Sequence, residues 1–73
     1  MAFEGRTYKQ KGGYRENAIR FADHDGGVAT TAYSYDMSEE EKYAMARRIT
    51  AALNLTRHLS VEQMEAAAPL VRR

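Results

Sequence analysis

The sequence contains no cysteine and no tryptophan, and its single proline is Pro69. Without cysteine, the chain has neither a disulfide nor a cysteine-ligated zinc site to stabilise it. A chain of 73 residues forms one small domain with a thin hydrophobic core. The sequence therefore predicts a single domain over residues 1–73 that depends on regular local structure, or on association with further copies, for its stability.

The chain also lacks an excess of charge of either sign. Eleven Lys and Arg residues stand against ten Asp and Glu residues, which gives a net charge of +1. A protein whose main partner is nucleic acid or an anionic membrane usually carries a clear positive excess. This balance of charges argues that neither nucleic acid nor a membrane is the principal partner.

Long hydrophobic runs are missing as well. The first ten residues, MAFEGRTYKQ, contain neither an apolar run nor a small-residue cleavage pattern. No segment approaches the length of about 20 apolar residues that crosses a bilayer as a helix. With 44% hydrophobic and 29% charged residues, the composition is typical of a globular chain. We expect a soluble, cytoplasmic protein that does not associate with a membrane.

Glycine is confined to the first part of the chain, because the last glycine is Gly27. The first half is rich in Thr, Tyr and Val, which favour strands, and the second half is rich in Ala, Glu, Arg and Met, which favour helices. The sequence predicts an α+β fold in which two or three antiparallel strands pack against one main helix, with a short C-terminal helix.

The segment ENAIRFADHDGGVATTAYSY predicts a β-hairpin. Its strands cover residues 17–23 and 28–35, and Asp25-Gly26 is expected to form a two-residue turn between them. Residues 6–11 offer a third strand, which is polar enough to belong at the edge of a sheet. Whether this third strand forms is left open by the sequence.

The two-residue turn also predicts a register, because it places Ile19 opposite Ala32 and Phe21 opposite Thr30. One face of the hairpin is then the more apolar and is expected to face the core. The residues on that face are Ile19, Phe21, Val28 and Ala32.

The segment SEEEKYAMARRITAALN predicts the main helix. Ser38 is expected to be its N-cap, and Glu41 three residues later completes a capping box. Asn54 is expected to end the helix as a left-handed C-cap. The apolar stripe of this helix consists of Met45, Ala46, Ile49, Ala52 and Leu53.

The segment LSVEQMEAAAP predicts the short second helix. Ser60 is its expected N-cap, Gln63 completes a second capping box, and Leu59 can pack on Met64 as a hydrophobic staple. Pro69 disfavours helical geometry at the residue before it, so the helix is expected to end there.

Residues able to do chemistry are few. Asp23, His24 and Asp25 form the only such cluster, but a hairpin tip brings too few ligands together for a metal, and Asp25 beside a glycine is a common turn residue. The serines at the helix starts serve as caps, and the acidic first helical turn is solvated. The sequence predicts no catalytic residue, no metal site and no cofactor, and hence a protein that is not an enzyme.

A more informative pattern is GRTYKQKGGYR, in which cations alternate with aromatic rings. Such a pattern is typical of surfaces that bind single-stranded nucleic acid and equally typical of protein–protein hot spots. The near-zero net charge favours a protein partner, although nucleic acid stays open. The candidate partner-binding residues are Arg6, Tyr8, Lys9, Lys11, Tyr14, Arg15, Tyr33 and Tyr35.

The segment EEEKYAMARRITAALNLTRHLSVEQMEA resembles a module of small phage and prophage proteins. In that module an acidic helix start leads into an "ANARRIVAAVNA"-like core, and a second helix resembling "ST-x-E-x-L-E" follows. The resemblance covers about the last half of the chain, and Tyr43, Met45 and Leu59 depart from it. The matching residues are Ala46, Arg47, Arg48, Ile49, Ala51, Leu53, Asn54, Ser60, Glu62 and Glu65.

In such phage proteins the module follows a β-hairpin of variable sequence, and it carries no catalytic residue. The resemblance implies an accessory protein of the host cytoplasm that binds and inhibits a host protein, such as a CRISPR or nucleotide-signalling component of bacterial defence. A homodimer or another small homo-oligomer is expected. Two alternatives stay open: a small nucleic-acid or nucleotide-binding protein, and a structural or assembly protein of the virion. The sequence names neither the target nor the oligomeric state.

Overall fold

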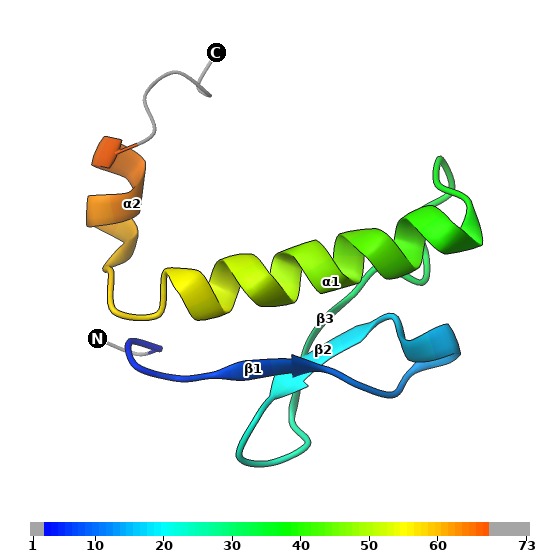
Figure 1. The fold of residues 1–73 in the computed structure, drawn as a ribbon, viewed down its shortest axis with the longest axis horizontal. Coiled ribbons are helices and arrows are strands. Elements are labelled where there is room, and N and C mark those ends of the chain that lie inside the picture. The colour runs from blue at the N-terminus through cyan, green and yellow to red at the C-terminus, as the bar shows by residue number, and fades with distance from the viewer. Residues whose placement is uncertain (1–2, 68–73) are drawn as a thin grey trace.

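The computed structural model describes residues 3–67 and has an α+β fold, as predicted (Figure 1). A three-stranded antiparallel sheet with the order β1-β2-β3 packs against a long helix, and a short second helix follows. The elements are β1 (Tyr8–Gln10), a 3₁₀ turn η1 (Tyr14–Glu16), β2 (Ala18–Phe21), β3 (Gly27–Thr30), α1 (Glu39–Leu55) and α2 (Val61–Ala67). The third strand, which the sequence left open, forms at an edge of the sheet.

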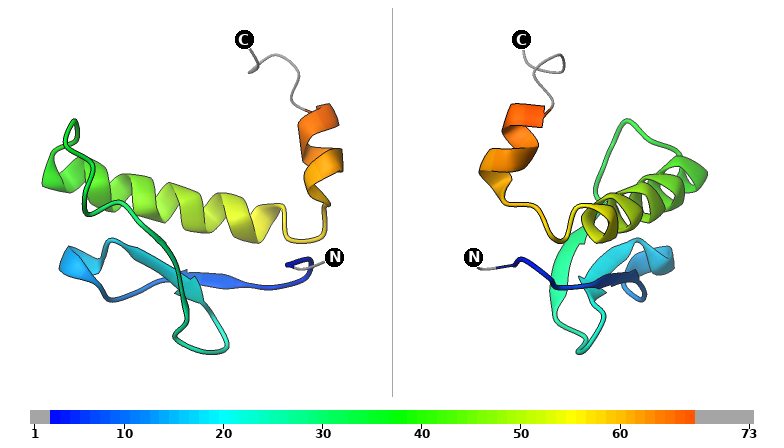
Figure 2. Two further views of the ribbon diagram at one scale, coloured as in Figure 1. Left: turned by 180° about the vertical axis from the view of Figure 1, so that it is seen from behind. Right: turned by 60° about the vertical axis from the view of Figure 1, so that its left-hand side comes forward.

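The molecule is a flat, two-layered body whose shortest extent is 14 Å. Helix α1 covers one face of the sheet, whereas α2 turns away from the end of α1 and stands clear of the sheet (Figure 2). No residue of α2 is buried. Neither helix in the described range 3–67 is long and apolar enough to cross a membrane.

Both helices begin with the capping boxes that the sequence predicts. The Ser38 hydroxyl oxygen accepts a hydrogen bond from the Glu41 backbone N–H at 3.2 Å, and the Glu41 carboxylate accepts from the Ser38 N–H at 2.9 Å. Ser60 and Gln63 repeat this exchange at 3.1 and 2.8 Å. Each box pairs two N–H groups that the helix itself leaves without partners. The predicted helix end near Pro69 lies outside the described residues.

The predicted end of the main helix is wrong. Helix α1 continues through Leu55, and its C-cap is Thr56, which has φ −99° and ψ 13° and no left-handed geometry. The Asn54 side chain instead bonds to the backbone of Tyr8. Its Oδ1 accepts from the Tyr8 N–H at 2.8 Å, and its Nδ2 donates to the Tyr8 carbonyl at 3.0 Å. Asn54 therefore joins α1 to the edge strand β1.

The core between the layers is small. Within the described range, the buried apolar side chains are Ala18, Ile19 and Ala46. The predicted stripe of α1 is partly wrong, because Met45 and Ala52 are exposed while Ile49 and Leu53 are half-buried. The side of α1 that faces the sheet is therefore centred on Ala46.

The predicted register of the hairpin is also wrong. Ile19 lies opposite Ala29, three residues from the predicted partner, and a bulge separates this pair from the pair of Arg20 with Gly27. Residues 22–26 form a five-residue loop in place of the two-residue turn. The loop is closed by the Phe21 N–H, which donates to the Gly26 carbonyl at 3.0 Å, and inside the loop the Gly26 N–H donates to His24 Nδ1 at 3.0 Å. A contact within the loop has replaced the tight Asp-Gly turn.

Strand β3 is shorter than predicted because the chain turns toward the helix after Thr30. The Thr31 side chain is buried, and its hydroxyl donates to the Lys42 carbonyl at 2.7 Å. Val28, which was expected in the core, is exposed, so the predicted division of faces fails for β3. Tyr33 and Tyr35 accordingly belong to the connection before α1 and not to a strand.

Candidate functional site: an apolar cleft between the helices and the sheet

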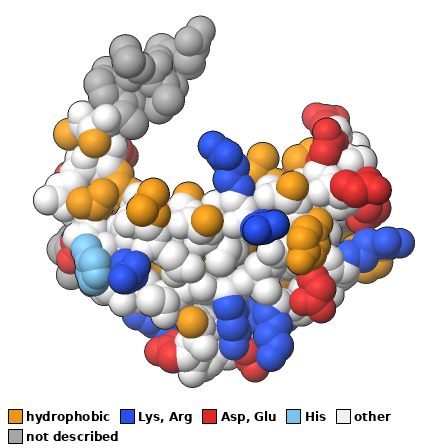
Figure 3. Space-filling view, viewed as in Figure 1, with side chains coloured by type: hydrophobic (Ala, Val, Ile, Leu, Met, Phe, Trp, Pro, Cys, Tyr) orange, Lys and Arg blue, Asp and Glu red, His pale blue; other side chains and the backbone are white. Residues whose placement is uncertain are grey.

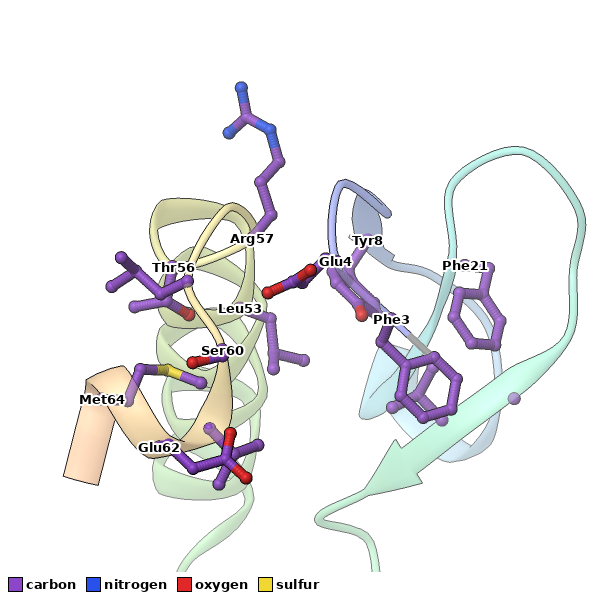
Figure 4. A pocket seen from close by; sticks show the side chains of 14 residues that line it. Phe3, Glu4, Tyr8, Phe21, Leu53, Thr56, Arg57, Ser60, Glu62 and Met64 are labelled. Carbon is purple, nitrogen blue, oxygen red and sulfur yellow. The ribbon is translucent and has the colours of Figure 1, made fainter. Parts of the chain in front are cut away.

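A cleft with a volume of about 650 Å³ opens between the helical layer and the sheet. In Figure 4, Phe3 and Phe21 on the sheet side lie opposite Leu53 and Met64 on the helical side. Glu4, Arg57 and Glu62 add charged groups. The apolar side chains that line the cleft are Phe3, Tyr8, Phe21, Val28, Leu53, Leu59, Val61 and Met64.

The sheet side of the cleft is a cluster of rings around Phe21. The centroid of the Phe21 ring lies 6.1 Å from that of Phe3, 5.5 Å from that of Tyr8 and 5.1 Å from that of His24. The guanidinium carbon of Arg6 stands 4.1 Å from the Phe21 centroid, in cation–π geometry. Phe21 thus combines an apolar surface with an adjacent cation.

The helical side of the cleft results from the turn between α1 and α2. The Arg57 guanidinium donates to the Asn54 carbonyl at 2.7 Å, and the Gly5 N–H donates to the Arg57 carbonyl at 2.6 Å. These bonds hold the N-terminal segment against the end of α1. The capping box at Ser60 then starts α2 in a new direction, so that Val61 and Met64 complete the cleft.

Four of the sequence-predicted partner residues lie on β1 or directly beside it. At its beginning, Tyr8 lines the cleft and Arg6 covers Phe21. On β1 itself, Lys9 forms an ion pair with Asp25 at 2.7 Å, and this hydrogen bond and charge hold the pKa of Asp25 below its usual value. Lys11 follows β1, is exposed, and accepts a hydrogen bond at its carbonyl from Arg20 Nε.

The other four predicted residues lie in η1, which follows β1, or in the connection after β3. Arg15 lies over the Tyr14 ring at 5.3 Å and pairs with Glu39 at 3.7 Å, which brings η1 to the start of α1. The hydrogen bond and charge of Tyr14, followed by the charge of Glu39, raise the pKa of Arg15. Tyr33 and Tyr35 are 78% and 98% exposed. The eight predicted partner-binding residues therefore do not form one continuous surface.

The cations of the predicted surface are largely paired within the chain. Arg6 bonds to Asp23 at 3.4 Å, Lys9 to Asp25 and Arg15 to Glu39. These pairs reduce the positive field that a phosphate backbone would meet. Among residues 3–67, no three His, Asp or Glu side chains gather as potential metal ligands.

Sequence reasoning missed most of the cleft. The sequence predicts Leu53 in the apolar stripe of the main helix and Met64 in a hydrophobic staple, and it gives Phe3 no role. The segment LNLTRHLSVEQM carries apolar residues on both sides of the turn between the helices, and this was the available sign of a cleft at that junction.

No protein-family model matches the chain, and comparison with curated proteins and with solved structures finds no similar protein.

Proposed function

We propose that the chain is a non-enzymatic accessory protein that binds a host protein and inhibits it by occupying its surface. The apolar cleft is the docking site, and it receives hydrophobic side chains from the partner. The observation that carries this proposal is the cleft itself, whose lining is mainly apolar and aromatic.

The size and chemistry of the cleft support this role. A volume of about 650 Å³ lies in the range of about 300–1,000 Å³ that pockets for small-molecule ligands occupy, so the cleft has room for a few side chains of a partner. Phe3 and Val61 are 61% and 59% exposed at its margin. Aromatic and aliphatic side chains in such a position gain most from burial against a partner.

The class of partner follows from the sequence resemblance. Small phage proteins with a comparable helical module are often accessory factors directed against host machinery. We infer that the partner is a host protein, with components of bacterial defence such as CRISPR effectors or nucleotide-signalling enzymes as the first targets to examine.

Affinity capture from host lysate tests the proposal. The tagged chain is incubated with lysate in the presence and absence of nuclease, and captured proteins are identified by mass spectrometry. Val61→Glu places a charge in the cleft, whereas Leu55→Glu places the same charge on an 84% exposed site of α1 outside it. We expect one nuclease-resistant host protein that the L55E variant retains and the V61E variant loses.

Binding of the identified protein is then measured by calorimetry. A hot-spot position predicts a loss of affinity of about tenfold or more for V61E. Equal binding by wild type, L55E and V61E would remove the cleft as the docking site.

A second candidate function is binding of a nucleotide or a single-stranded nucleic acid in the same cleft. It is favoured by the guanidinium of Arg6 beside Phe21 and Tyr8, since rings stack on bases while arginine pairs with phosphate. This function predicts binding of oligonucleotides or nucleotides that weakens steeply with salt and with Arg6→Gln, but much less with Lys11→Gln. Affinity that does not change with salt would exclude it.

A further inference from the structure

The side of α1 that faces away from the sheet carries exposed apolar residues. Figure 3 shows hydrophobic side chains along this helix, with Lys or Arg side chains between them. Met45 is exposed, as are the small residues Ala44 and Ala51. The sheet covers only the opposite side, so this face has no covering element in the described chain.

A depression of about 430 Å³ lies on this face near the start of α1. Its lining consists of two acidic residues, two methionines, one alanine and one arginine. The lining residues are Asp36, Met37, Glu41, Ala44, Met45 and Arg48.

Glu41 and Arg48 do not form an ion pair with each other within the described chain. Glu41 and Arg48 are seven residues apart, which is nearly two helical turns and about 10 Å along the axis, so they share a side of the helix. Arg48 makes no ion pair or hydrogen bond through its side chain within residues 3–67. Glu41 uses its Oε1 to accept from the Ser38 N–H, which leaves Oε2 for another cation.

We propose that a second copy of the chain binds this face, so that two α1 helices pack antiparallel about a two-fold axis between Ala44 and Met45. In this arrangement Arg48 of each copy lies beside Glu41 of the other, which makes two identical ion pairs. The small Ala44 side chain lets the helices approach, and Met45 adapts to fill the contact.

The charge pattern also argues against an axis at Arg48. An axis at Arg48 itself would place two arginines opposite each other, which costs free energy at an interface. The axis between Ala44 and Met45 instead pairs each arginine with a carboxylate. The contact uses none of the residues that line the apolar cleft. The proposed dimer can therefore be tested independently of the proposed function.

Sedimentation equilibrium of the whole chain over a wide range of concentrations tests the proposal. Wild type is expected to associate into dimers. Arg48→Glu replaces both ion pairs by repulsions and is expected to raise the dimer dissociation constant about tenfold or more. The matched control is Arg47→Glu, which changes the neighbouring exposed arginine by the same charge and should leave the constant nearly unchanged.

The double variant E41R/R48E exchanges the charges and should restore association, with circular dichroism to confirm that the helix persists without its Glu41 capping bond. A wild type that stays monomeric throughout would overturn the proposal. Equal weakening by R47E and R48E would overturn it as well.

A cross-linking measurement tests the position of the axis without altering any charge. Because the chain has no cysteine, Ala44→Cys introduces a single thiol next to the proposed axis, and oxidation should convert it rapidly into a disulfide-linked dimer. Ala66→Cys on α2 is the control and should cross-link slowly. Similar rates for both variants would contradict the antiparallel pair.

Discussion

Asn17 is a fully buried residue whose side-chain nitrogen and oxygen have no hydrogen-bond partner among residues 3–67. Its backbone is paired, since its N–H donates to the Tyr14 carbonyl and its carbonyl accepts from the Thr31 N–H. A buried amide without a partner costs about 1–3 kcal/mol. The side chain therefore lowers the stability of the region where β2 begins.

We predict that Asn17→Leu raises the free energy of unfolding by about 1–2 kcal/mol, because no hydrogen bond is lost and apolar area is gained. Urea denaturation followed by circular dichroism measures the change. Asn17→Asp is the opposite control, since it buries a charge without a partner and should destabilise the protein. A destabilised N17L variant would show that the amide has a partner in solution.

Asn54 is the residue that ties the two layers together, through its two bonds to the Tyr8 backbone. We predict that Asn54→Ala lowers the free energy of unfolding by about 1–3 kcal/mol, because the half-buried N–H and C=O of Tyr8 lose their partners. Leu55→Ala, at an exposed neighbouring position, should change it by less than about 0.5 kcal/mol. Hydrogen exchange at the Tyr8 amide should accelerate in N54A alone. Equal effects of the two variants would contradict this role.

At the scale of elements, the ion pair of Lys9 with Asp25 links β1 to the loop between β2 and β3. The pKa of Asp25 is lower in the folded chain than its ordinary value of 3.8. Stability from this pair is therefore present above about pH 4 and is lost as the pH falls through the lower folded pKa. Because Asp25 is exposed, the contribution is small.

We predict that Asp25→Asn lowers the melting temperature at pH 7 and that the difference from wild type disappears in strong acid. Thermal melts of both proteins between pH 7 and pH 2 measure this. Glu65→Gln, an exposed carboxylate of α2, serves as the control for general charge effects. A difference between D25N and wild type that persists in strong acid would mean that the ion pair is not its cause.

The elements themselves were predictable where their causes are local. The boxes at Ser38 and Ser60 start the helices within a span of four residues, and their geometry agrees with the prediction. Where the prediction failed, at the end of β3 and the end of α1, side chains bond to other elements: Thr31 to the Lys42 carbonyl and Asn54 to the Tyr8 backbone. Such long-range partners leave no trace in the periodicity of the sequence.

The candidate site, too, could be predicted only where single segments determine it. Tyr8 and Arg6 were selected from their own segment, and both stand at the cleft or against its ring cluster. The cleft also needs Phe3, which lies far from Leu53 and Met64 in the sequence. Their meeting depends on the direction in which α2 leaves α1, and that direction could not be derived from residue patterns.

At the scale of the whole molecule, few buried side chains support a chain of 73 residues. A second copy that binds only the folded chain would add stability by mass action. We predict that the melting temperature of wild type rises by several degrees for each tenfold increase in concentration, and that R48E shows a much weaker dependence. Scanning calorimetry at several concentrations measures this. If the melting temperatures of both proteins depended equally on concentration, the proposed helix pair would not be the source of the added stability.

The dimer would also place two apolar clefts far apart. Leu53 lies about 13 Å along α1 from the proposed axis, so the two clefts would be separated by about 25 Å along the helices. Such a dimer can engage two copies of a partner or two sites on one assembly. Two linked sites bind a dense surface more tightly than either site alone.

We therefore predict that wild type dissociates at least about tenfold more slowly than R48E from the captured host protein immobilised at high density. At low density, where only one cleft can bind, the two proteins should dissociate at the same rate. Surface plasmon resonance at both densities measures this. Slower dissociation of wild type at both densities would mean that Arg48 contacts the partner directly, whereas equal rates at both would mean that the two clefts act separately.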